Sequence, residues 1–305
     1  MSELPGLPRE FAGYRLERRL AVGGMSELYR ASRAQPNEGR EPLAMKLLLP
    51  HLCDRAEPRK LFANEAQITL WCSHPNVVRA VASGAAEGRP YLALELLSGC
   101  DLGHIAEGHR SRRRPVPWRV AAGIVAGACA GLHHAHELCV DGRLLRLVHR
   151  DVNPSNLMVG PDGLVRLLDF GLARADGLVD PVVTGVAPGV AAYTAPEQFR
   201  GMPLDRRADI FSVGVILHEL LTGRRLFWRG NEAATMLAVV ESPIPAPSSV
   251  REDLPMGLDA VVARALWRDP RGRYSSAAEL QRDLLAFASN ADASIGNLVR
   301  ATMDT

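Results

Sequence analysis

The chain has 305 residues, of which 47% are hydrophobic and 23% are charged, and its formal net charge is +2. This balance is typical of a globular domain with a substantial core and argues against a nucleic-acid binder, which needs a concentrated basic face. Its five cysteines form no Cys-x-x-Cys pair, which indicates free thiols. No secretory signal opens the chain and no run of about 18 apolar residues occurs, so we expect a cytoplasmic location and no membrane span.

The first third of the chain is predicted to be rich in strands. Residues 1–13 are punctuated by Pro and Gly and are expected to form a loose lead-in. From Tyr14 to about Leu97, strands are expected in "YRLERRLAV", "SELYRASRA", "LAMKLLLP", "VVRAVASGA" and "RPYLALELL". One helix is expected in "PRKLFANEAQITLWCS", where apolar residues recur at spacings of three and four before His74-Pro75-Asn76 ends it.

Two features of this part point to chemistry. The turn "LAVGGMSEL", residues 20–28, has small residues that would let backbone N–H groups approach a phosphate. Lys46 is flanked by apolar residues on both sides, so its ammonium group needs a partner. Glu65, on the predicted helix, is the candidate partner by position.

After Ser98-Gly99 the pattern changes to helices. They are predicted in "WRVAAGIVAGACAGLHHAHEL", "DRRADIFSVGVILHELLTG", "LDAVVARALW" and "SSAAELQRDLLAFAS". Gly223 should end the second helix, and Ser276 with Glu279 should form a capping box on the last.

Two clusters near the first of these helices have plain interpretations. The densest basic patch is favoured as a solvated loop, with an acidic partner or substrate site as the alternative; it comprises Arg110, Arg112, Arg113 and Arg114. Three histidines are interpreted as packed or surface residues, because only Glu137 could join them as a metal ligand; they are His133, His134 and His136.

The segment "VHRDVNPSNLMVGPDGLVRLLDFG", residues 148–171, carries the most informative motifs. His149-Arg150-Asp151 is followed by Asn156 and, thirteen residues later, by Asp169-Phe170-Gly171. "AAYTAPEQ" follows at residues 191–198. With the glycine turn and the lysine of "LAMKLL" upstream, these motifs occur in an order that resembles the eukaryotic-like serine/threonine protein kinases of bacteria, over about Tyr14 to Ala288.

The resemblance implies a two-lobed α+β protein kinase fold that binds ATP in the cleft between the lobes. The N-lobe, residues 14–97, would be small and β-rich with one main helix, and the C-lobe, residues 98–288, would be larger and α-helical. Residues 289–305 would form a C-terminal tail. The implied reaction is Mg²⁺-dependent transfer of the ATP γ-phosphoryl group to Ser or Thr hydroxyls of protein substrates. Autophosphorylation is expected, and dimerisation would allow it to occur in trans.

The resemblance also implies catalytic roles. Asp151 would be the base that orients the substrate hydroxyl, and Glu65 would hold Lys46 against the α- and β-phosphates. Asn156 and Asp169 would bind Mg²⁺ through hard oxygen donors.

A larger set of residues is expected to contact ATP: Leu20, Ala21, Val22, Gly23, Gly24, Met25, Ser26, Leu28, Ala44, Lys46, Glu95, Leu97, Asp101 and Met158. Within it, Leu28 and Ala44 would cover the adenine from one side and Met158 from the other. The backbone of residues 95–97 would bond the adenine edge, and Asp101 would meet the ribose unless it is a solvated turn residue.

Three residues are expected to support the larger lobe. Glu197 of Ala-Pro-Glu should pair with Arg273, and Asp209 should brace the backbone of the catalytic loop. The alternative for Asp209 and Arg273 is ordinary surface charge.

Thr184 is the hydroxyl residue between Gly171 and Tyr193. We predict it as an autophosphorylation site whose phosphate pairs with Arg150 and Arg174. An unmodified loop threonine is the alternative.

The chain departs from the family pattern at several positions. In the glycine turn, Gly23 alone matches G-x-G-x-x-G, with Ala21 and Ser26 at the outer positions. Thr69 stands where a larger apolar residue often packs against Phe170.

The two most consequential departures are Asn153, in place of a lysine, and Val190, in place of a threonine. In the typical enzyme these two side chains bond each other, so losing both leaves no orphaned partner. Some bacterial members also have a small polar residue in place of the lysine. The lost contact is worth about 1.5–3 kcal/mol, or about one to two decades in rate, so transfer should be slowed and not abolished.

An active kinase is therefore favoured. The first alternative is a pseudokinase that binds ATP and regulates a partner. The second is a small-molecule phosphotransferase of related fold, which the Ala-Pro-Glu segment and the helix with Asp209 disfavour because they build a platform for protein substrates.

Overall fold

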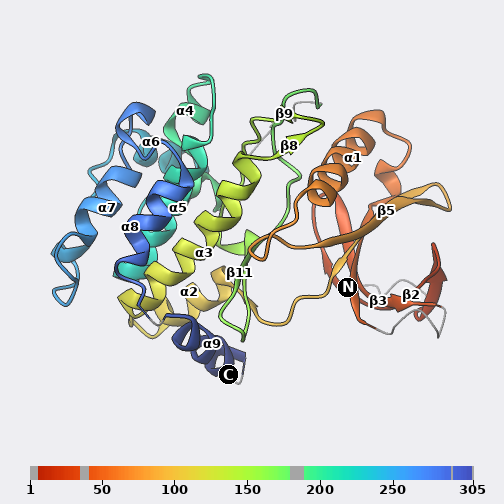
Figure 1. Cartoon of the computed structure of the whole chain (residues 1–305), viewed down its shortest axis with the longest axis horizontal. Helices are drawn as coiled ribbons and strands as arrows, with labels where there is room; N and C mark the ends of the chain where they lie inside the picture. The colour runs from red at the N-terminus through yellow and green to blue at the C-terminus, as the bar shows by residue number, and fades with distance from the viewer. Residues whose placement is uncertain (1–5, 35–40, 179–188, 290, 304–305) are drawn as a thin grey trace. The chain divides into compact units, whose positions relative to one another are not determined.

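The computed structural model describes residues 6–34, 41–178, 189–289 and 291–303, and the chain divides into two compact units (Figure 1). Unit 1 comprises residues 1–73, 78–97 and 169–171. Unit 2 comprises residues 74–77, 98–168 and 172–305.

Unit 1 is built on an antiparallel sheet with the strand order β1-β2-β3-β4-β6-β5. Burial alternates along β3, as expected for a strand with one face in the core. Tyr29, Met45 and Leu47 are fully buried in the core cluster on that face. The strands are β1 (Arg9–Phe11), β2 (Tyr14–Val22), β3 (Ser26–Arg33), β4 (Leu43–Leu48), β5 (Ala80–Ala86) and β6 (Arg89–Glu95).

The expected loose lead-in is wrong for its last residues, because Arg9–Phe11 forms β1 and pairs with the start of β2. Ala12 (φ 53°) and Gly13 (φ 79°) form a two-residue turn with both φ angles positive, which matches the twist of a hairpin. Phe11 and Tyr14 both lie in the core cluster. The burial of Phe11 therefore holds a segment that has no clear strand pattern of its own.

Helix α1 (Ala56–Trp71) follows a short 3₁₀ turn, η1 (Pro50–Leu52), and packs on β5 and β6. Its buried face includes Phe62 and Ala66, which belong to a second core cluster with Leu92. The helix begins and ends two residues before the predicted limits of 58 and 73.

Unit 2 is mainly helical, with two small sheets. No helix among the described residues is long and apolar enough to cross a membrane. The helices are α2 (Leu102–Ser111), α3 (Trp118–His136), α4 (Pro196–Phe199), α5 (Arg207–Thr222), α6 (Glu232–Glu241), α7 (Leu258–Ala265), α8 (Ala277–Leu285) and α9 (Ala291–Met303), and the 3₁₀ turns are η2 (Pro154–Asn156), η3 (Val190–Tyr193), η4 (Pro247–Ser249) and η5 (Pro270–Gly272). The strands β7 (Cys100–Asp101), β10 (Leu157–Val159) and β11 (Val165–Leu167) form one sheet, and β8 (Cys139–Val140) and β9 (Arg143–Leu144) form a hairpin.

Helices α3, α5 and α8 lie side by side and form the centre of unit 2 (Figure 1). Gly223 ends α5 in the left-handed conformation (φ 67°), as predicted. Ser276 caps α8 by accepting the Glu279 N–H, also as predicted. The Glu279 carboxylate, however, accepts the N–H of Ser275, so the capping box is shifted by one residue.

The predicted C-terminal tail contains α9, which packs on α2, α3, β7 and β10. Two glycines allow this close approach. A Cβ atom on Gly123 would lie 2.6 Å from that of Ala291, and one on Gly296 would lie 2.5 Å from the Pro161 carbonyl oxygen. These contacts join segments far apart in sequence, which explains why the local pattern did not predict them.

A buried ion pair holds the Ala-Pro-Glu segment in unit 2. Arg273 Nη1 and Nη2 donate to Glu197 Oε1 and Oε2, each at 2.7 Å. The other three guanidinium N–H groups donate to the carbonyl oxygens of Trp267, Arg207 and Arg268. All five donors of Arg273 are therefore used, as burial of a guanidinium requires.

Replacing Glu197 with Gln should lower the free energy of unfolding by about 3–5 kcal/mol, because the Arg273 charge would remain buried without its carboxylate. Arg271→Gln is the matched control, since it breaks an exposed pair with Asp269 and should leave the free energy of unfolding close to the wild-type value. Urea unfolding of the two variants measures the difference. Equal losses in both would contradict the prediction.

Candidate active site

In unit 1, the structure brings together Lys46, Glu65 and Asp169. Lys46 lies in β4 between the buried residues Met45 and Leu47, and its side chain points to the opposite face of the sheet. Its Nζ donates to Glu65 Oε1 at 2.5 Å and lies 3.2 Å from Asp169 Oδ2. The ammonium therefore has two carboxylate partners, one from α1 and one from the Asp-Phe-Gly turn.

The three charges of this cluster are strongly coupled. Burial disfavours the charged form of Lys46, but the carboxylates of Glu65 and Asp169 outweigh it and raise the pKa of Lys46. Burial raises the pKa of Glu65 to about 7, with Asp169 adding to the increase and Lys46 opposing it. Asp169 is the most exposed of the three, with 44% of its side chain accessible. It is therefore the carboxylate of the cluster that solvent reaches most easily.

The predicted phosphate turn joins β2 and β3. Gly23 N–H donates to Ser26 O at 2.8 Å, and Val22 pairs with Glu27. A Cβ on Gly24 would touch nothing, so this position leaves open space. The residues predicted to contact ATP here differ in exposure. Those exposed are Ala21, Val22, Gly23, Gly24 and Met25, and those half-buried are Leu20, Ser26 and Leu28.

The sheet register places two predicted adenine contacts on the Lys46 face of the sheet. Leu28 is directly opposite Lys46 in the ladder, and Ala44 is two residues along β4. At the end of β6, Glu95 N–H donates to Arg79 O, so this amide is not available to bond adenine. Leu97, beyond β6, is half-buried.

Two further predicted ATP contacts lie in unit 2. Met158 in β10 pairs with Asp101 in β7. Asp101 caps α2 by accepting the His104 N–H at 2.9 Å. The predicted ribose contact of Asp101 is therefore accompanied by a local role that sequence analysis did not assign.

In unit 2, the predicted catalytic loop (residues 149–156) brings Asp151, Asn153 and Asn156 together. Asn153 Nδ2 donates to Asp151 Oδ1 at 2.9 Å, and Asn156 Nδ2 donates to Asp151 Oδ2 at 2.8 Å. Both carboxylate oxygens of Asp151 are thus oriented by amide donors.

Asn153 also fixes the backbone of the loop. Its Oδ1 accepts the Ser155 N–H at 3.0 Å, which caps the η2 turn that begins at Pro154. With its oxygen on Ser155, the amide must present its NH₂ group to Asp151. A lysine could not accept this capping bond. The Asn-Pro pair in the sequence was the available clue to this second role.

Asp209 braces the loop from α5, as the resemblance implied. Its Oδ2 accepts the backbone N–H of His149 at 2.9 Å and lies 2.8 Å from His136 Nε2. Its Oδ1 accepts the N–H of Arg150 at 2.9 Å, where the backbone is left-handed (φ 66°). Burial opposes its charge, but these donors outweigh it and lower the pKa of Asp209.

Two of the three helical histidines have identified partners within unit 2. His136 is fully buried against Asp209, and His134 stacks on His74 with ring centroids 5.1 Å apart. Across the residues that the structure describes, no three His, Cys, Asp or Glu side chains are grouped to hold a metal ion.

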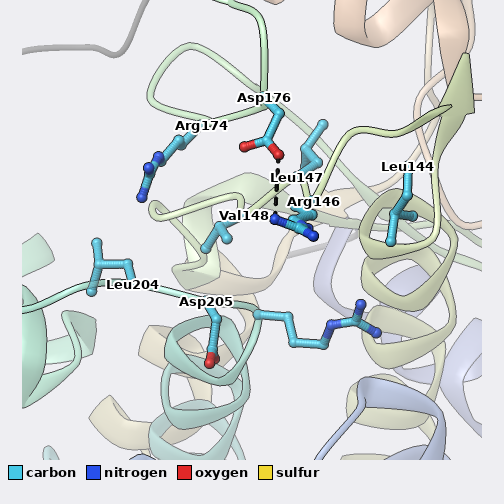
Figure 2. A pocket seen from close by; sticks show the side chains of 9 residues that line it. Leu144, Arg146, Leu147, Val148, Arg174, Asp176, Leu204 and Asp205 are labelled. Carbon is cyan, nitrogen blue, oxygen red and sulfur yellow. Dashed lines mark ion pairs between the residues drawn. The ribbon is translucent and has the colours of Figure 1, made fainter.

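Thr184, the predicted phosphorylation site, lies outside the described residues. Arg174, one of its expected partners, lines a cavity of about 290 Å³ in unit 2 (Figure 2). Arg146 and Asp176 form an exposed ion pair there at 3.8 Å, and Asp205 also lines the cavity. Arg206 lines it too, so three arginines and two aspartates meet there and the charge of the cavity is mixed.

Comparison with known proteins gives consistent matches over most of the chain. Residues 14–285 match the family model described as "Protein kinase domain". "Tyrosine-protein kinase MasK" of Myxococcus xanthus is 37% identical over 284 residues, which are 93% of this chain and 44% of that protein. "Serine/threonine-protein kinase PknB" of Mycobacterium leprae is 35% identical over 282 residues, 90% of this chain and 43% of that protein. The chain thus spans less than half the length of these curated relatives.

Among solved structures, the kinase domain of PknI from Mycobacterium tuberculosis matches with a TM-score of 0.67 and 26% sequence identity. The match covers 93% of this chain and all of that one.

Replacing Asp209 with Asn should destabilise the protein by about 3 kcal/mol, because a buried charge with three donors is lost. The folded pKa lies below the ordinary value of 3.8, so the stabilisation is present above that value and is lost as pH falls through the folded pKa. The difference from wild type in urea unfolding should therefore shrink below about pH 4. Asp162→Asn is the comparison variant: the pKa of Asp162 is also lowered by its bond to Arg166, but this carboxylate is about half exposed, so its loss should destabilise the protein much less. A pH-independent difference would contradict the assignment.

Proposed function

The chain belongs to the protein kinase domain family, and we propose that it transfers the γ-phosphoryl group of ATP to Ser or Thr hydroxyls of proteins. The observation that carries this proposal is Asp151, whose two carboxylate oxygens are each oriented by an asparagine amide. The fold class predicted from the sequence, the two-lobed protein kinase fold, is confirmed by the family and structure matches. Residues 14–97 and 98–288 are our proposed N- and C-lobes.

We propose that ATP is held by the residues that the kinase resemblance implied. Lys46 would bind the α- and β-phosphates, since its charge is secured by Glu65. The open space at Gly24 would let the backbone of the turn approach the phosphates. Leu28 and Ala44 would cover one face of the adenine, because the register puts them on the Lys46 face.

The remaining contacts to the adenine are proposed from the position of Met158 and from the backbone hydrogen bonds near Glu95. Met158 would cover the other face of the adenine. With the Glu95 N–H bonded to Arg79, the Glu95 carbonyl and the backbone of Leu97 are the groups proposed to bond its edge.

The donor set fits Mg²⁺. Asn156 uses its Nδ2 on Asp151, which leaves the hard oxygen Oδ1 for a cation, and Asp169 has an accessible carboxylate. Bound Mg²⁺ would neutralise charge on the phosphates. Asn156 and Asp169 are therefore the proposed ligands.

Asp151 would act on the substrate hydroxyl. Its carboxylate would accept the hydroxyl proton as the oxygen bonds to the γ-phosphorus and the bond to the departing ADP breaks. Asn153 would position this carboxylate with a neutral donor, in place of the cation that the family pattern puts there.

The names of the relatives bear on which hydroxyl amino acid accepts the phosphoryl group. The relatives include one named as a tyrosine kinase and several named as serine/threonine kinases, at similar identity. We propose Ser and Thr, with Thr184 as an autophosphorylation site in trans. Phosphoamino acid analysis of the products distinguishes Ser and Thr from Tyr.

Replacing Asp151 with Asn should reduce phosphoryl transfer at least about 100-fold, because Asn cannot accept the hydroxyl proton. Transfer from labelled ATP with Mg²⁺ to a generic acceptor protein measures this. The control is Asp141→Asn, at an exposed turn position of the β8–β9 hairpin with a left-handed backbone that Asn tolerates. Intact ATP binding by wild type with no transfer would instead identify a pseudokinase.

A graded series at position 153 tests the positioning role of Asn153. Asn153→Ala removes the donor to Asp151 and should lower kcat by about three- to tenfold, the worth of a neutral hydrogen bond. Asn153→Asp keeps an acceptor for Ser155 N–H but places a like charge beside Asp151, so the loss should be larger. KM for ATP should change little in both variants. A wild-type kcat for Asn153→Ala would refute the role.

A further inference from the structure

Unit 2 contains a second cavity, of about 390 Å³, that the proposed phosphoryl transfer does not use. It is lined by Glu107, Arg110, Gly189, Arg225 and Trp228. Two guanidinium groups and an indole ring thus line one small cavity. Arg110 belongs to the basic patch of residues 110–114. The alternative interpretation of that patch in the sequence was a site for an acidic partner or substrate.

The cavity is connected to the catalytic loop by one face of α2. A Cβ on Gly103, in the first turn of α2, would lie 3.4 Å from Ser155 Oγ in the η2 turn. Glu107 and Arg110 follow Gly103 by four and seven residues, so they continue the same helix face. Arg110 therefore lies about 10 Å along the helix axis from the turn that Asn153 caps. An extended peptide covers this distance in about three residues.

The opposite wall of the cavity is tied to the segment that ends in Ala-Pro-Glu. Arg225 Nη1 donates to the Tyr193 hydroxyl and lies 3.3 Å from Glu219 Oε2. Tyr193 also donates to Glu219 at 2.9 Å. Further along this segment, Gln198 Nε2 donates to Arg150 O in the catalytic loop at 3.4 Å. The α2 wall and the Arg225 wall of the cavity therefore both belong to segments that contact the loop containing Asp151.

The two guanidinium groups have unused capacity for an anion. Arg110 donates to Glu107, whose side chain is 62% exposed, and Arg225 uses Nη1 alone on the residues that the structure describes. Burial and the like charge of Arg225 lower the pKa of Arg110. A carboxylate between them would relieve this repulsion and could accept bidentate hydrogen bonds. The Trp228 ring would exclude water from one side of such a contact.

We propose that this cavity binds an acidic side chain of the protein substrate, about three residues from the phosphorylated residue, through Arg110 and Arg225. This inference rests on the proposed kinase function and adds a preference for acidic sequences to it. A competing interpretation gives the cavity a basic side chain, attracted by Glu107. Glu219 does not support that interpretation, because it is buried and already bonded by Arg225, Tyr193 and the Leu226 N–H.

The test uses a peptide library with a fixed acceptor, in which each flanking position carries Glu, Gln or Lys in turn. With wild-type protein, Glu should be preferred over Gln by about tenfold in kcat/KM at one position about three residues from the acceptor. Arg110→Gln should bring this ratio close to one, and Arg110→Glu should favour Lys there. Arg110 is chosen over Arg225, whose bonds to Tyr193 and Glu219 also support the fold.

Arg113→Gln is the matched control, since it removes the same charge from the same basic run at a residue that does not line the cavity. It should keep the wild-type ratio. Transfer to a generic acceptor protein, measured in parallel, tests the proposed function separately. Transfer without an acidic preference, a preference that survives Arg110→Gln, or a preference for Lys in wild type would overturn this inference alone. No transfer to any acceptor would overturn both.

Discussion

The buried carboxylate of Asp209 is the constraint on which the organisation of unit 2 depends. It accepts the N–H groups of His149 and Arg150, whose backbone would otherwise leave two buried donors without acceptors. Arg150 adopts a left-handed backbone that is unfavourable for a residue with a side chain. The carboxylate offsets this cost and sets the direction in which the next residue, Asp151, leaves the loop.

In unit 1 the corresponding constraint is a buried cation. Lys46 lies within a strand whose other side chains are apolar, so its charge is tolerated only where carboxylates meet it. Glu65 comes from α1 and Asp169 from the Asp-Phe-Gly turn, so one ammonium group joins three separate segments. The two carboxylates differ in exposure: Glu65 is buried with the lysine, and Asp169 remains accessible to solvent.

Two departures from the family pattern, at Asn153 and Thr69, have local explanations in the structure. Asn153 lacks the positive charge of the lysine in the family pattern, but it provides a donor to Asp151 and an acceptor for the η2 turn. Thr69 is buried and donates its hydroxyl to the Glu65 carbonyl oxygen at 2.7 Å, so the smaller residue leaves no unsatisfied polar atom. Both replacements therefore have polar partners nearby.

The sequence by itself determined the fold class and the long elements and gave the candidate reactive residues, because these depend on periodicity and on motifs a few residues long. It did not determine β1 or α9, whose short or weakly patterned segments are held by the burial of Phe11 and by the close approach of Ala291 to Gly123. Nor did it show that Asn153 bonds Asp151, or that Arg110 and Arg225 line one cavity. These relations depend on hydrogen-bond direction and on contacts across more than a hundred residues, which only the tertiary structure decides.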